Sequence, residues 1–408
     1  MTALQEHGII APIILLLALT LSGCTGPASP TAVRPTSTAE ATAAVSPPPS
    51  TAMPSRTSTS TSQPTPTAAR AAFQPKVEVV ASGLEVPWAL AFAPDSRLFF
   101  TERPGRVRVM DKGRLVLDPV ATLPVASVGE AGLMGLVLDP DFARNGYLYV
   151  MYTYRDGQNR LRSRVSRLTE RANKAAEEKA LLEGIPGANI HDGGRLKFGP
   201  DGKLYITTGD ASDTSQSQNL ASLAGKVLRL NSDGSIPSDN PFPGSPVYSY
   251  GHRNPQGLAW HPTSGRLFST EHGPVGNDEV NIIQTGRNYG WPELSGKGGA
   301  PKYIDPIISF APSVAPSGAT FYSGSELAPW KGNLFFTTLV GQHLHRIVLN
   351  SDLTGVERDE RLFSGEYGRL RDVIQGPDGF LYFATSNRDG RGRPSSEDDR
   401  ILRIVPGS

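Results

Sequence analysis

After Phe73 the chain repeats one pattern of apolar and polar positions. Each unit opens with a turn of the Pro-Asp type, continues with an alternating apolar run of strand length, and ends in a second run of basic and apolar alternation. The units are APDSRLFFTERPGRVRVM from Ala93, DPDFARNGYLYVMYTY from Asp139, GPDGKLYITTGD from Gly199 with GKVLRL from Gly225, HPTSGRLFSTEHGP from His261 with DEVNII, KGNLFFTTLVGQHLHRIVL from Lys331, and GPDGFLYFATSNRDG from Gly376 with DDRILRIV near the C-terminus.

This repetition predicts the fold class. Alternation with a period of two between turn residues indicates antiparallel strands, and repeated hairpins at such spacing are typical of propeller blades. The six units therefore predict an all-β domain over residues 76–408, a six-bladed β-propeller. A β-sandwich with duplicated hairpins is the alternative. One segment, Glu170–Leu182 (ERANKAAEEKALL), has a helical pattern and is predicted to be a helical insertion on a blade edge, with a charged hairpin as its alternative.

The N-terminal part has a different character. Residues Ile9–Leu21 are an apolar run, short for a bilayer span, that ends in LSGC, so residues 1–23 resemble the signal peptide of a bacterial lipoprotein. The resemblance implies cleavage before Cys24, acylation of its sulfur, and an exported protein anchored to the membrane and facing the periplasm or the cell exterior. Glu6 and His7 stand where such a peptide normally carries Lys or Arg. A soluble chain with an apolar N-terminus is the alternative.

Residues 24–75 form a second N-terminal region, rich in Pro, Ser, Thr and Ala. From Thr25 to Ala72 this region contains no Ile, Leu, Phe, Tyr or Trp. Such a sequence cannot bury enough apolar surface to offset the entropy of ordering it. We therefore predict a disordered tether that holds the propeller away from the membrane.

Composition narrows the classes of partner. Forty Lys and Arg against 39 Asp and Glu leave a net charge of +1, so the chain has no basic field that would hold nucleic acid. The 43 Gly and 35 Pro suit many short strands joined by tight turns. Cys24 is the one cysteine, which excludes an intrachain disulfide and a cysteine-based metal site.

The segment 251–292 concentrates polar side chains in turns rich in Gly and Pro. Its polar residues are His252, Arg253, Asn254, His272, Asp278 and Glu279. A purely structural turn does not need Arg beside Asn and two histidines, so we favour a binding or catalytic site. The backbone carbonyls of Gly273 and Pro274, near two acidic residues, suit a hard cation such as Ca²⁺, although the spacing alone leaves a turn without a cation equally open.

Two further clusters carry candidate chemistry. In NIHDGGRLKFGPDGKLYITTGD, His191 precedes a pair of glycines and Asp210 ends the next strand. A carboxylate beside a histidine fixes its tautomer and raises its basicity for proton abstraction, although a structural histidine next to a turn fits equally well. In YGRLRDVIQGPDG, Arg369 and Arg371 alternate and project on one face, which suits a ligand with several carboxylates. Surface arginines on an edge strand are the alternative.

Several motifs together resemble one enzyme family. They are GEAGLMGLVLDPDF, IHDGGRL with GPDGKLYITTGD, GKVLRLNSDGSIPSDNPF, GHRNPQGLAW, EHGPVGNDEVN, NYGWP and RLRDVIQGPDG. From roughly Val77 to Val405 the chain resembles the soluble quinoprotein glucose dehydrogenases and aldose sugar dehydrogenases, and the shorter loops favour the aldose sugar dehydrogenase branch. The resemblance implies that a sugar C1 hydroxyl is oxidised to the lactone, with hydride transfer to pyrroloquinoline quinone (PQQ) held over the propeller by Ca²⁺ and with an external electron acceptor.

The resemblance also implies residue roles. His191 matches the base that takes the C1 hydroxyl proton, and Asp210 matches the carboxylate that orients this histidine. Arg253 and Asn254 match residues that contact the quinone oxygens, where negative charge develops on reduction. The remaining matches are Gly273 and Pro274, whose carbonyls bind the calcium, and Arg369 and Arg371, which bind the cofactor carboxylates.

Two positions depart from the family pattern. Val340 stands where the glucose dehydrogenases carry a cofactor-binding Lys, with Gln342 or His343 as possible substitutes. Glu130, at the cofactor site, stands where the family often has Gln, and a carboxylate near a polyanion is unfavourable unless Arg or Ca²⁺ offsets it. These departures support an alternative, a non-catalytic propeller that binds carbohydrate or protein without PQQ. A calcium-dependent lactonase is a third reading, but it needs several carboxylate or Asn ligands on the axis.

The lipid anchor gives a first testable prediction. In the full-length chain, Cys24→Ala should move the protein from the membrane fraction to the soluble fraction, because the acylated sulfur is the predicted attachment. Fractionation and immunoblotting measure this, with Thr25→Ala as the matched control. A Cys24→Ala protein that stays in the membrane pellet contradicts the lipoprotein prediction.

Overall fold

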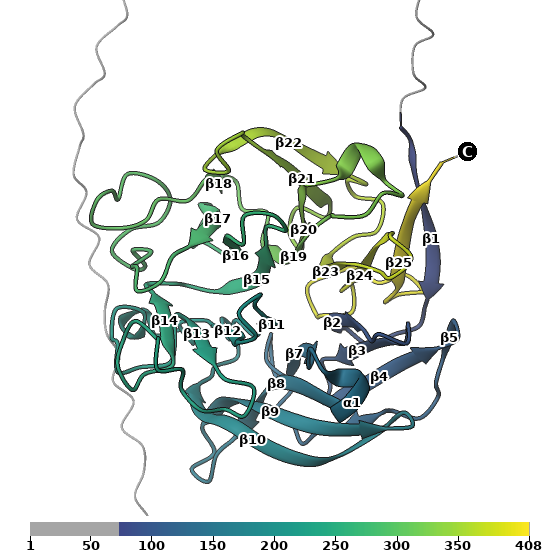
Figure 1. Ribbon diagram of the computed structural model, residues 1–408, viewed down its shortest axis with the longest axis horizontal. Coiled ribbons are helices and arrows are strands. Elements are labelled where there is room, and N and C mark those ends of the chain that lie inside the picture. Colours follow the sequence, from purple (N-terminus) through teal and green to yellow (C-terminus); the bar gives the residue numbers. More distant parts are fainter. Residues whose placement is uncertain (1–72, 408) are drawn as a thin grey trace, which may run out of the picture. The chain divides into compact units, whose positions relative to one another are not determined.

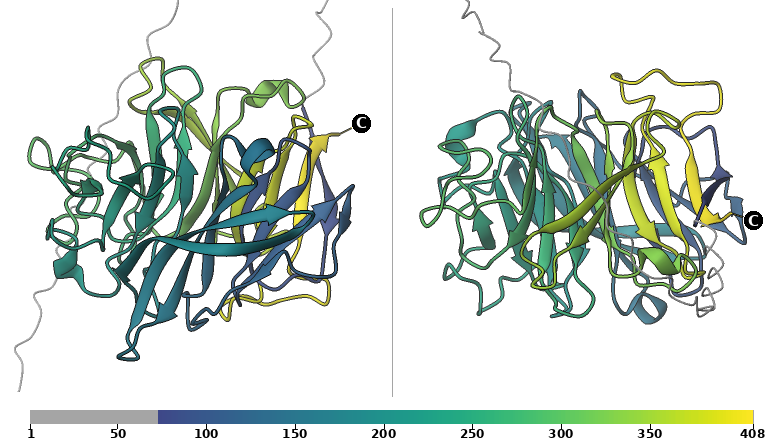
Figure 2. Two further views of the ribbon diagram at one scale, coloured as in Figure 1. Left: turned by 60° about the horizontal axis from the view of Figure 1, so that its bottom comes forward. Right: turned by 90° about the horizontal axis from the view of Figure 1, so that it is seen from above.

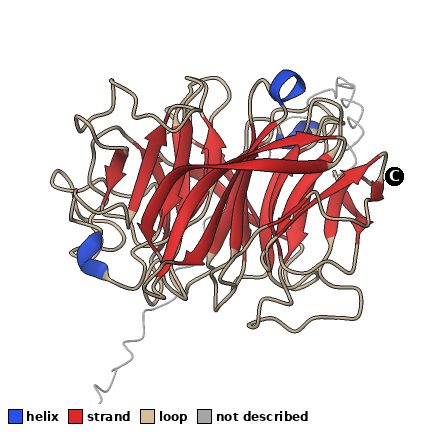
Figure 3. Cartoon of the chain, turned by 90° about the horizontal axis from the view of Figure 1, so that it is seen from below, coloured by secondary structure: helices blue, strands red, loops and turns tan. Residues whose placement is uncertain are grey.

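Six antiparallel sheets stand around a common axis in residues 73–407, the part of the chain that this computed structural model describes (Figure 1). They confirm the predicted all-β, six-bladed propeller, with helix limited to short turns (Figure 3). The predicted signal peptide, Cys24 and almost all of the predicted tether lie outside the described residues. Within residues 73–407, none of the helices has the length and apolar character needed to cross a membrane.

The first three sheets follow one another along the chain. The first contains β2 (Pro87–Phe92), β3 (Leu98–Glu102), β4 (Arg106–Asp111), β5 (Arg114–Leu115) and β6 (Ala121–Thr122). The second contains β7 (Leu133–Leu138), β8 (Tyr147–Arg155), β9 (Leu161–Arg171) and β10 (Lys174–Pro186), with helix α1 (Phe142–Asn145) between β7 and β8. The third contains β11 (Leu196–Phe198), β12 (Leu204–Thr208), β13 (Lys226–Leu230) and β14 (Val247–Tyr250), with a 3₁₀ turn at Thr214–Gln216.

The last three sheets complete the ring. The fourth contains β15 (Pro255–Trp260), β16 (Leu267–Glu271), β17 (Asp278–Ile283) and β18 (Ile308–Phe310). The fifth contains β19 (Pro316–Phe321), β20 (Leu334–Thr338), β21 (Leu344–Leu349) and β22 (Val356–Leu362), with a 3₁₀ turn at Ala328–Trp330. The sixth contains β23 (Leu370–Gln375), β24 (Leu381–Thr385) and β25 (Ile401–Pro406), and β1 (Pro75–Ala81) forms its outer strand.

The sixth sheet joins the two ends of the described chain. Strand β1 pairs antiparallel with β25, and Pro75 lies opposite Pro406 at one end of this pairing. Figure 1 shows β1 and β25 side by side at the edge of the ring. The repeat pattern predicted six units but did not show that the last one is completed by the strand that precedes the first.

Side chains are buried on both faces of the second strand of each blade. In β12 all five residues are buried, although two of them are threonines. Each sheet is covered on both sides by its neighbours, so both alternating sets of side chains face protein. Apolar residues therefore pack between blades, for example Phe99, Leu148 and Leu228, which are all completely buried.

The helical prediction for Glu170–Leu182 is wrong, and its hairpin alternative is confirmed. The segment contains the end of β9, a turn, and most of β10, which together form a long hairpin on the second blade (Figure 2). Ala172 and Asn173 adopt positive φ angles of 51° and 62°, which reverse the chain. Pairing of β10 along β9 thus overrides the local helical preference of this Ala, Glu and Lys-rich sequence.

A polar network crosses the axis between the inner strands. The buried Asp372 on β23 accepts hydrogen bonds from the Leu90 backbone N–H on β2 (2.9 Å) and from Arg195 Nη1, just before β11 (3.0 Å). Arg195 Nε donates to the carbonyl of Gln256 on β15 at 2.9 Å. Gln256 Oε1 in turn accepts from Ser317 on β19 at 3.1 Å. These bonds connect five of the six blades through buried groups.

Candidate functional site

Strand direction brings the predicted site residues to one end of the propeller. Within each blade the first two strands are antiparallel, so the loop before the first strand and the loop after the second lie at the same end of the sheet. His191 precedes β11 and Asp210 follows β12, while Arg253 precedes β15 and His272 follows β16. Loops from several blades therefore meet around the axis, as expected for a propeller site.

The structure brings His191 and Asp210 together. Nδ1 of His191 lies 2.9 Å from Oδ1 of Asp210, whose side chain is only 1 % exposed, whereas the His191 side chain is 16 % exposed. His191 has a positive φ of 63°, and its carbonyl accepts from the Ala211 N–H, so the backbone also ties the two loops. With Nδ1 donating to the carboxylate, Nε2 is the ring atom that remains as a proton acceptor.

Asp210 is held by further donors that the sequence did not indicate. Its Oδ2 accepts from the indole Nε1 of Trp291 at 2.9 Å, and its Oδ1 also accepts from the Ser212 N–H at 2.9 Å. The Asp210 N–H donates to the carbonyl of Arg253 at 2.7 Å. Trp291 belongs to the NYGWP motif, which marked this segment but gave the tryptophan no role.

Arg253 and Asn254 lie beside this pair. The Arg253 guanidinium donates through Nη1 to the carbonyl of His272 at 3.2 Å and lies over the Trp291 ring, 5.3 Å from its centroid. Burial lowers the pKa of Arg253, although Asp210 and Glu271 oppose this effect, so the group remains a cation. Asn254 is completely buried and its Oδ1 accepts from the Gly193 N–H at 3.0 Å.

Glu130 reaches the same cluster from the loop before β7. Its Oε2 accepts from the His191 N–H at 3.3 Å, and its Oε1 pairs with Arg391 at 2.7 Å. Burial opposes ionisation, but His272, Arg391 and Arg371, together with the backbone bond, lower the pKa of Glu130 below its usual range. Glu130 is thus a carboxylate whose charge an arginine offsets, and Arg391 is a residue that sequence reasoning missed.

The loop after β16 carries Gly273 and Pro274. The buried Asp278 holds this loop, because its Oδ1 accepts from the Gly273 N–H at 2.8 Å and its Oδ2 from the backbone N–H groups of Val314 and Ala315 at 2.6 and 2.7 Å. The Asp278 oxygens are therefore committed to these backbone donors and to the Ser313 hydroxyl, which donates to Oδ2 at 2.6 Å. Among residues 73–407, no group of three or more His, Cys, Asp and Glu side chains is placed to hold a metal ion.

Glu271 and Glu279 form a buried pair of carboxyl groups behind this loop. They face each other across β16 and β17, and both line a small cavity together with Gly273 and Trp291. Glu271 accepts from the Arg253 N–H and from His252 Nδ1, the latter at 2.8 Å. Burial and the charge of Glu271 raise the pKa of Glu279 to about 8.

Arg369 directly precedes β23, the innermost strand of the sixth blade, and Arg371 lies on it. Both side chains are buried, so the alternative of surface arginines is wrong. Arg369 is 7 % exposed and pairs with Asp389 at 2.8 Å, while Arg371 is 4 % exposed and lies 3.7 Å from the same carboxylate. Arg371 Nη1 also donates to Gln256 Oε1 at 2.8 Å. Burial lowers the pKa of Arg371 to about 10, which leaves it charged at neutral pH.

Val340 lies in the loop after β20 and is 57 % exposed. The carbonyl of the preceding Leu339 accepts from Arg369 Nη1 at 3.2 Å, so this loop borders the arginine pair. His343 is 2 % exposed, and its two ring nitrogens contact the Gly341 carbonyl at 2.8 Å and His345 at 2.9 Å. His343 is thus not available to replace the missing Lys, which leaves Gln342 from the predicted pair.

Several nitrogens of the cluster have no hydrogen-bond partner within the described chain. They are Nε of Arg103, Arg253 and Arg371, and Nε2 of His272. Arg103, in the loop after β3, was not predicted and donates through Nη2 to the Asp389 carbonyl at 3.2 Å. Buried donors without partners at one site indicate a ligand rich in acceptors or ordered water.

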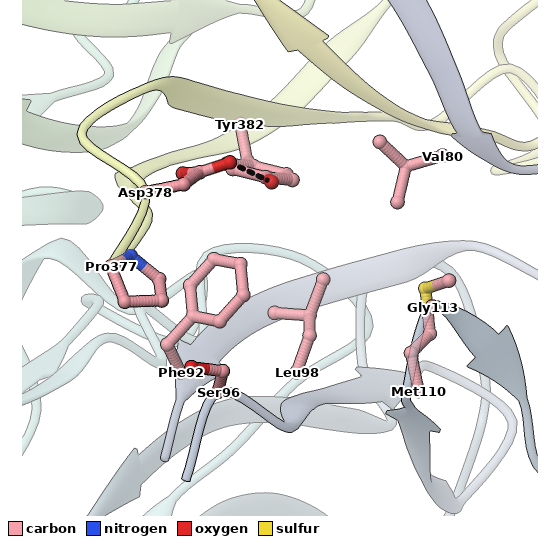
Figure 4. Close-up of a pocket in the computed structure, with 9 residues that line it drawn as sticks. All are labelled: Val80, Phe92, Ser96, Leu98, Met110, Gly113, Pro377, Asp378 and Tyr382. Carbon is pink, nitrogen blue, oxygen red and sulfur yellow. Dashed lines mark hydrogen bonds between the residues drawn. The ribbon is translucent and has the colours of Figure 1, made fainter. Parts of the chain in front are cut away.

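A separate apolar cavity of about 370 Å³ lies between the first and sixth blades (Figure 4). Phe92, Leu98, Met110 and Tyr382 line it, and Tyr382 donates to Asp378 at 2.7 Å. Phe92 ends β2 and Leu98 begins β3, so this cavity lies at the opposite ends of the strands from the His191 cluster. The polar cluster and this cavity are therefore different places on the molecule.

Comparison with known proteins gives a consistent result. Residues 84–402 match the family described as Glucose / Sorbosone dehydrogenase. An aldose sugar dehydrogenase of Escherichia coli is 36 % identical over 338 residues, covering 77 % of this chain and 91 % of its own length. A putative oxidoreductase (glucose dehydrogenase) of Thermus thermophilus has 46 % identity and a TM-score of 0.76, covering 81 % of this chain and all of its own. The PQQ-bound aldose sugar dehydrogenase of Streptomyces coelicolor has 39 % identity and a TM-score of 0.73, covering 82 % and 99 %.

The buried glutamate pair predicts a pH effect on stability. Between the ordinary value of 4.5 and about 8, Glu279 binds its proton in the folded protein but not in the unfolded chain. Stability should therefore fall as pH rises through this window, and Glu279→Gln should remove that fall. We expect the melting temperature of Glu279→Gln minus that of wild type, both measured in the presence of a chelator, to be larger at about pH 9 than at about pH 5.

The matched control is Glu357→Gln on the exposed face of β22. This substitution should leave the difference from wild type the same at both pH values. An equal difference for Glu279→Gln at both pH values contradicts the assignment of a protonated, buried Glu279.

Proposed function

The chain belongs to the Glucose / Sorbosone dehydrogenase family, and from this premise we propose that it oxidises the C1 hydroxyl of aldose sugars to the lactone. It is an oxidoreductase of the aldose sugar dehydrogenase type. The observation that carries the specific proposal is the pairing of His191 with the buried Asp210 beside the guanidinium of Arg253.

The residues at the site fit PQQ as the cofactor. The unpartnered nitrogens of Arg253, Arg371 and Arg103 match a group that is anionic and rich in acceptor oxygens. Arg253 and Asn254 would hold the quinone side, and Arg369 and Arg371 the carboxylates, while Arg391 offsets Glu130. When bound, PQQ supplies a two-electron acceptor for the hydride from C1.

The proton of the C1 hydroxyl passes to His191 Nε2. The imidazolium that forms is stabilised by the buried carboxylate of Asp210, whose Oδ1 accepts from Nδ1. Arg253 keeps a fixed positive charge near the point where negative charge develops, and such preorganised charge lowers the barrier. Each role is thus tied to a group whose position is set by a hydrogen bond rather than by flexible packing.

Calcium is proposed as a second component. Gly273 and Pro274 would supply backbone carbonyls, because Asp278 fixes their loop from behind and leaves the carbonyl oxygens as the ligands for a hard cation. A lactonase would instead need converging carboxylate or Asn side chains, which the committed oxygens of Asp278 do not provide.

The cellular setting is proposed from the sequence. Residues 1–23 would be a lipoprotein signal peptide, and residues 24–75 a tether between an acylated Cys24 and the propeller of residues 76–408. The protein would then be exported and face the periplasm or cell exterior, where an external acceptor takes the electrons. A non-catalytic propeller is less well supported, because a pure binding protein needs neither a buried carboxylate behind a histidine nor a clamp of arginines.

Reconstitution tests the function directly. Purified protein with PQQ and Ca²⁺ should reduce a dye with an aldose as donor, and omission of PQQ or addition of a chelator should abolish the signal. His191→Ala should lower kcat by about 10² to 10⁴-fold while PQQ binding stays nearly unchanged, because a general base acts on the transition state. Activity of His191→Ala within about two-fold of wild type would falsify the role of His191.

Val340→Lys tests how the missing cation affects the cofactor. A Lys in this exposed loop next to Leu339 and Arg369 would add an ammonium near an anionic cofactor. A charge-assisted contact of this kind contributes about 1.5 to 3 kcal/mol, so PQQ should bind about ten-fold or more tightly with the sugar preference unchanged. PQQ titration followed by absorbance or fluorescence measures the affinity.

Val275→Lys is the matched control, because Val275 is fully exposed on the neighbouring loop and the substitution adds the same charge to the same end of the propeller. Equal tightening by both variants would show a general electrostatic effect rather than a specific contact. Unchanged affinity of Val340→Lys in an active enzyme would mean that another group already occupies the position of the missing Lys.

A further inference from the structure

Trp291 is part of a conspicuous motif, NYGWP, whose chemistry the proposed roles do not use. It lies in the long segment between β17, which ends at Ile283, and β18, which begins at Ile308. This segment returns along the third blade, where Asn288 bridges to Tyr250 at the end of β14. His191 and Asp210 lie in the loops next to the two inner strands of a blade. Trp291 instead comes to the site from a long connection between two outer strands.

The backbone of Trp291 is fixed independently of its side chain. The Trp291 N–H donates to the Gly251 carbonyl at 2.9 Å, and the Trp291 carbonyl accepts from Gln218 Nε2 at 2.7 Å. Gln218 is itself held by Asn288, whose Nδ2 donates to Gln218 Oε1 at 2.8 Å. The ring can therefore be changed while the segment keeps these bonds.

The indole N–H has one partner in the described chain, and that partner is Asp210. The two carboxylate oxygens of Asp210 divide their donors: Oδ1 accepts from His191 Nδ1 and the Ser212 N–H, and Oδ2 accepts from Trp291 Nε1 at 2.9 Å. No other donor of residues 73–407 reaches Oδ2. Because Asp210 is 1 % exposed, water cannot readily replace this donor.

Donors on both oxygens fix the plane of the carboxylate. A carboxylate that is held on one oxygen alone can rotate about χ2, which is a broad torsion for Asp. Rotation would move Oδ1 away from His191 Nδ1 and allow the histidine proton to shift to Nε2, the atom that must stay free to accept the substrate proton. The hydrogen bond from Trp291 therefore acts on the reacting atoms indirectly, through Asp210 and His191.

We propose that Trp291 is a positioning residue, which holds Asp210 so that His191 stays in the Nδ1–H tautomer with Nε2 as the base. This inference rests on the proposed function for its kinetic consequence, but the arrangement of Trp291, Asp210 and His191 exists in the protein without cofactor. The same indole packs against Arg253, so it also keeps the guanidinium beside the site.

Trp291→Phe removes the N–H and keeps an aromatic ring. The first measurement is ¹⁵N NMR of the His191 imidazole in protein without PQQ, at a pH where the ring is neutral. Wild type should show the single Nδ1–H tautomer, and Trp291→Phe should show a mixture that contains the Nε2–H form. The matched control is Trp260→Phe at the far end of β15, which should leave the His191 spectrum unchanged.

The second measurement is kinetic, with protein reconstituted as above. Trp291→Phe should lower kcat about ten-fold, the effect of one lost hydrogen bond to a charged group, with KM and the PQQ dissociation constant within about two-fold of wild type. A merely structural role would lower the melting temperature, but it would not lower kcat while KM and the PQQ dissociation constant stay unchanged. If Trp291→Phe does not fold, replacement of Trp291 by 3-benzothienylalanine keeps the bicyclic shape and removes only the N–H.

The outcomes separate the two proposals. A pure Nδ1–H tautomer in the variant, or an unchanged kcat, overturns the positioning role of Trp291. A wild-type protein that shows the single tautomer but no sugar oxidation with PQQ overturns the proposed function while leaving the coupling of Trp291 to His191 intact.

Discussion

The bond on which the propeller depends most is the ion pair between Asp372 and Arg195 across the axis. Both side chains are buried, and Asp372 also accepts a hydrogen bond from the Leu90 N–H. One carboxylate therefore connects the first, third and sixth blades. Removing one partner of such a pair leaves an uncompensated buried charge, which commonly costs about 3 to 5 kcal/mol.

The proposed catalytic cluster is organised in the same way, by buried polar contacts at the end of the axis. Each proposed group is held by a polar partner from another segment: His191 by the buried Asp210, Glu130 by the exposed Arg391, and the Gly273 loop by the buried Asp278. Loops alone are mobile, but loops tied by hydrogen bonds to committed oxygens behave as parts of the scaffold. This arrangement explains how a fold of short strands, with only short helical turns and no cysteine in its described part, presents a preorganised site.

The sequence was sufficient for the strand pattern, which depends on local order, and for the cluster of residues, which the motifs of the family resemblance indicated. Alternation in six units specified the blades, and His191, Asp210, Arg253 and Asn254 were placed together as the motifs implied. What it missed depends on contacts that the sequence pattern does not show. Residues 170–182 form a hairpin because β9 offers a partner, Arg391 matters because Glu130 lies opposite, and Trp291 matters because a long segment turns back to Asp210. The contacts of Arg391 and Trp291 join residues far apart in the sequence. The hairpin is local, and it was missed because its Ala, Glu and Lys-rich strand has a helical preference.

The closure of the ring by β1 has a consequence for how the protein is made. Pro75 pairs with Pro406, so the sixth blade cannot exist until nearly the whole chain has been synthesised. Contacts of such large sequence separation form late and slowly, because the conformational entropy of closing the loop is lost before the stabilising contacts are made. The first blades can assemble from the chain as it emerges, but β1 must wait beside an incomplete ring with its edge unpaired. The last strand to be made, β25, therefore locks the first one, β1, in place.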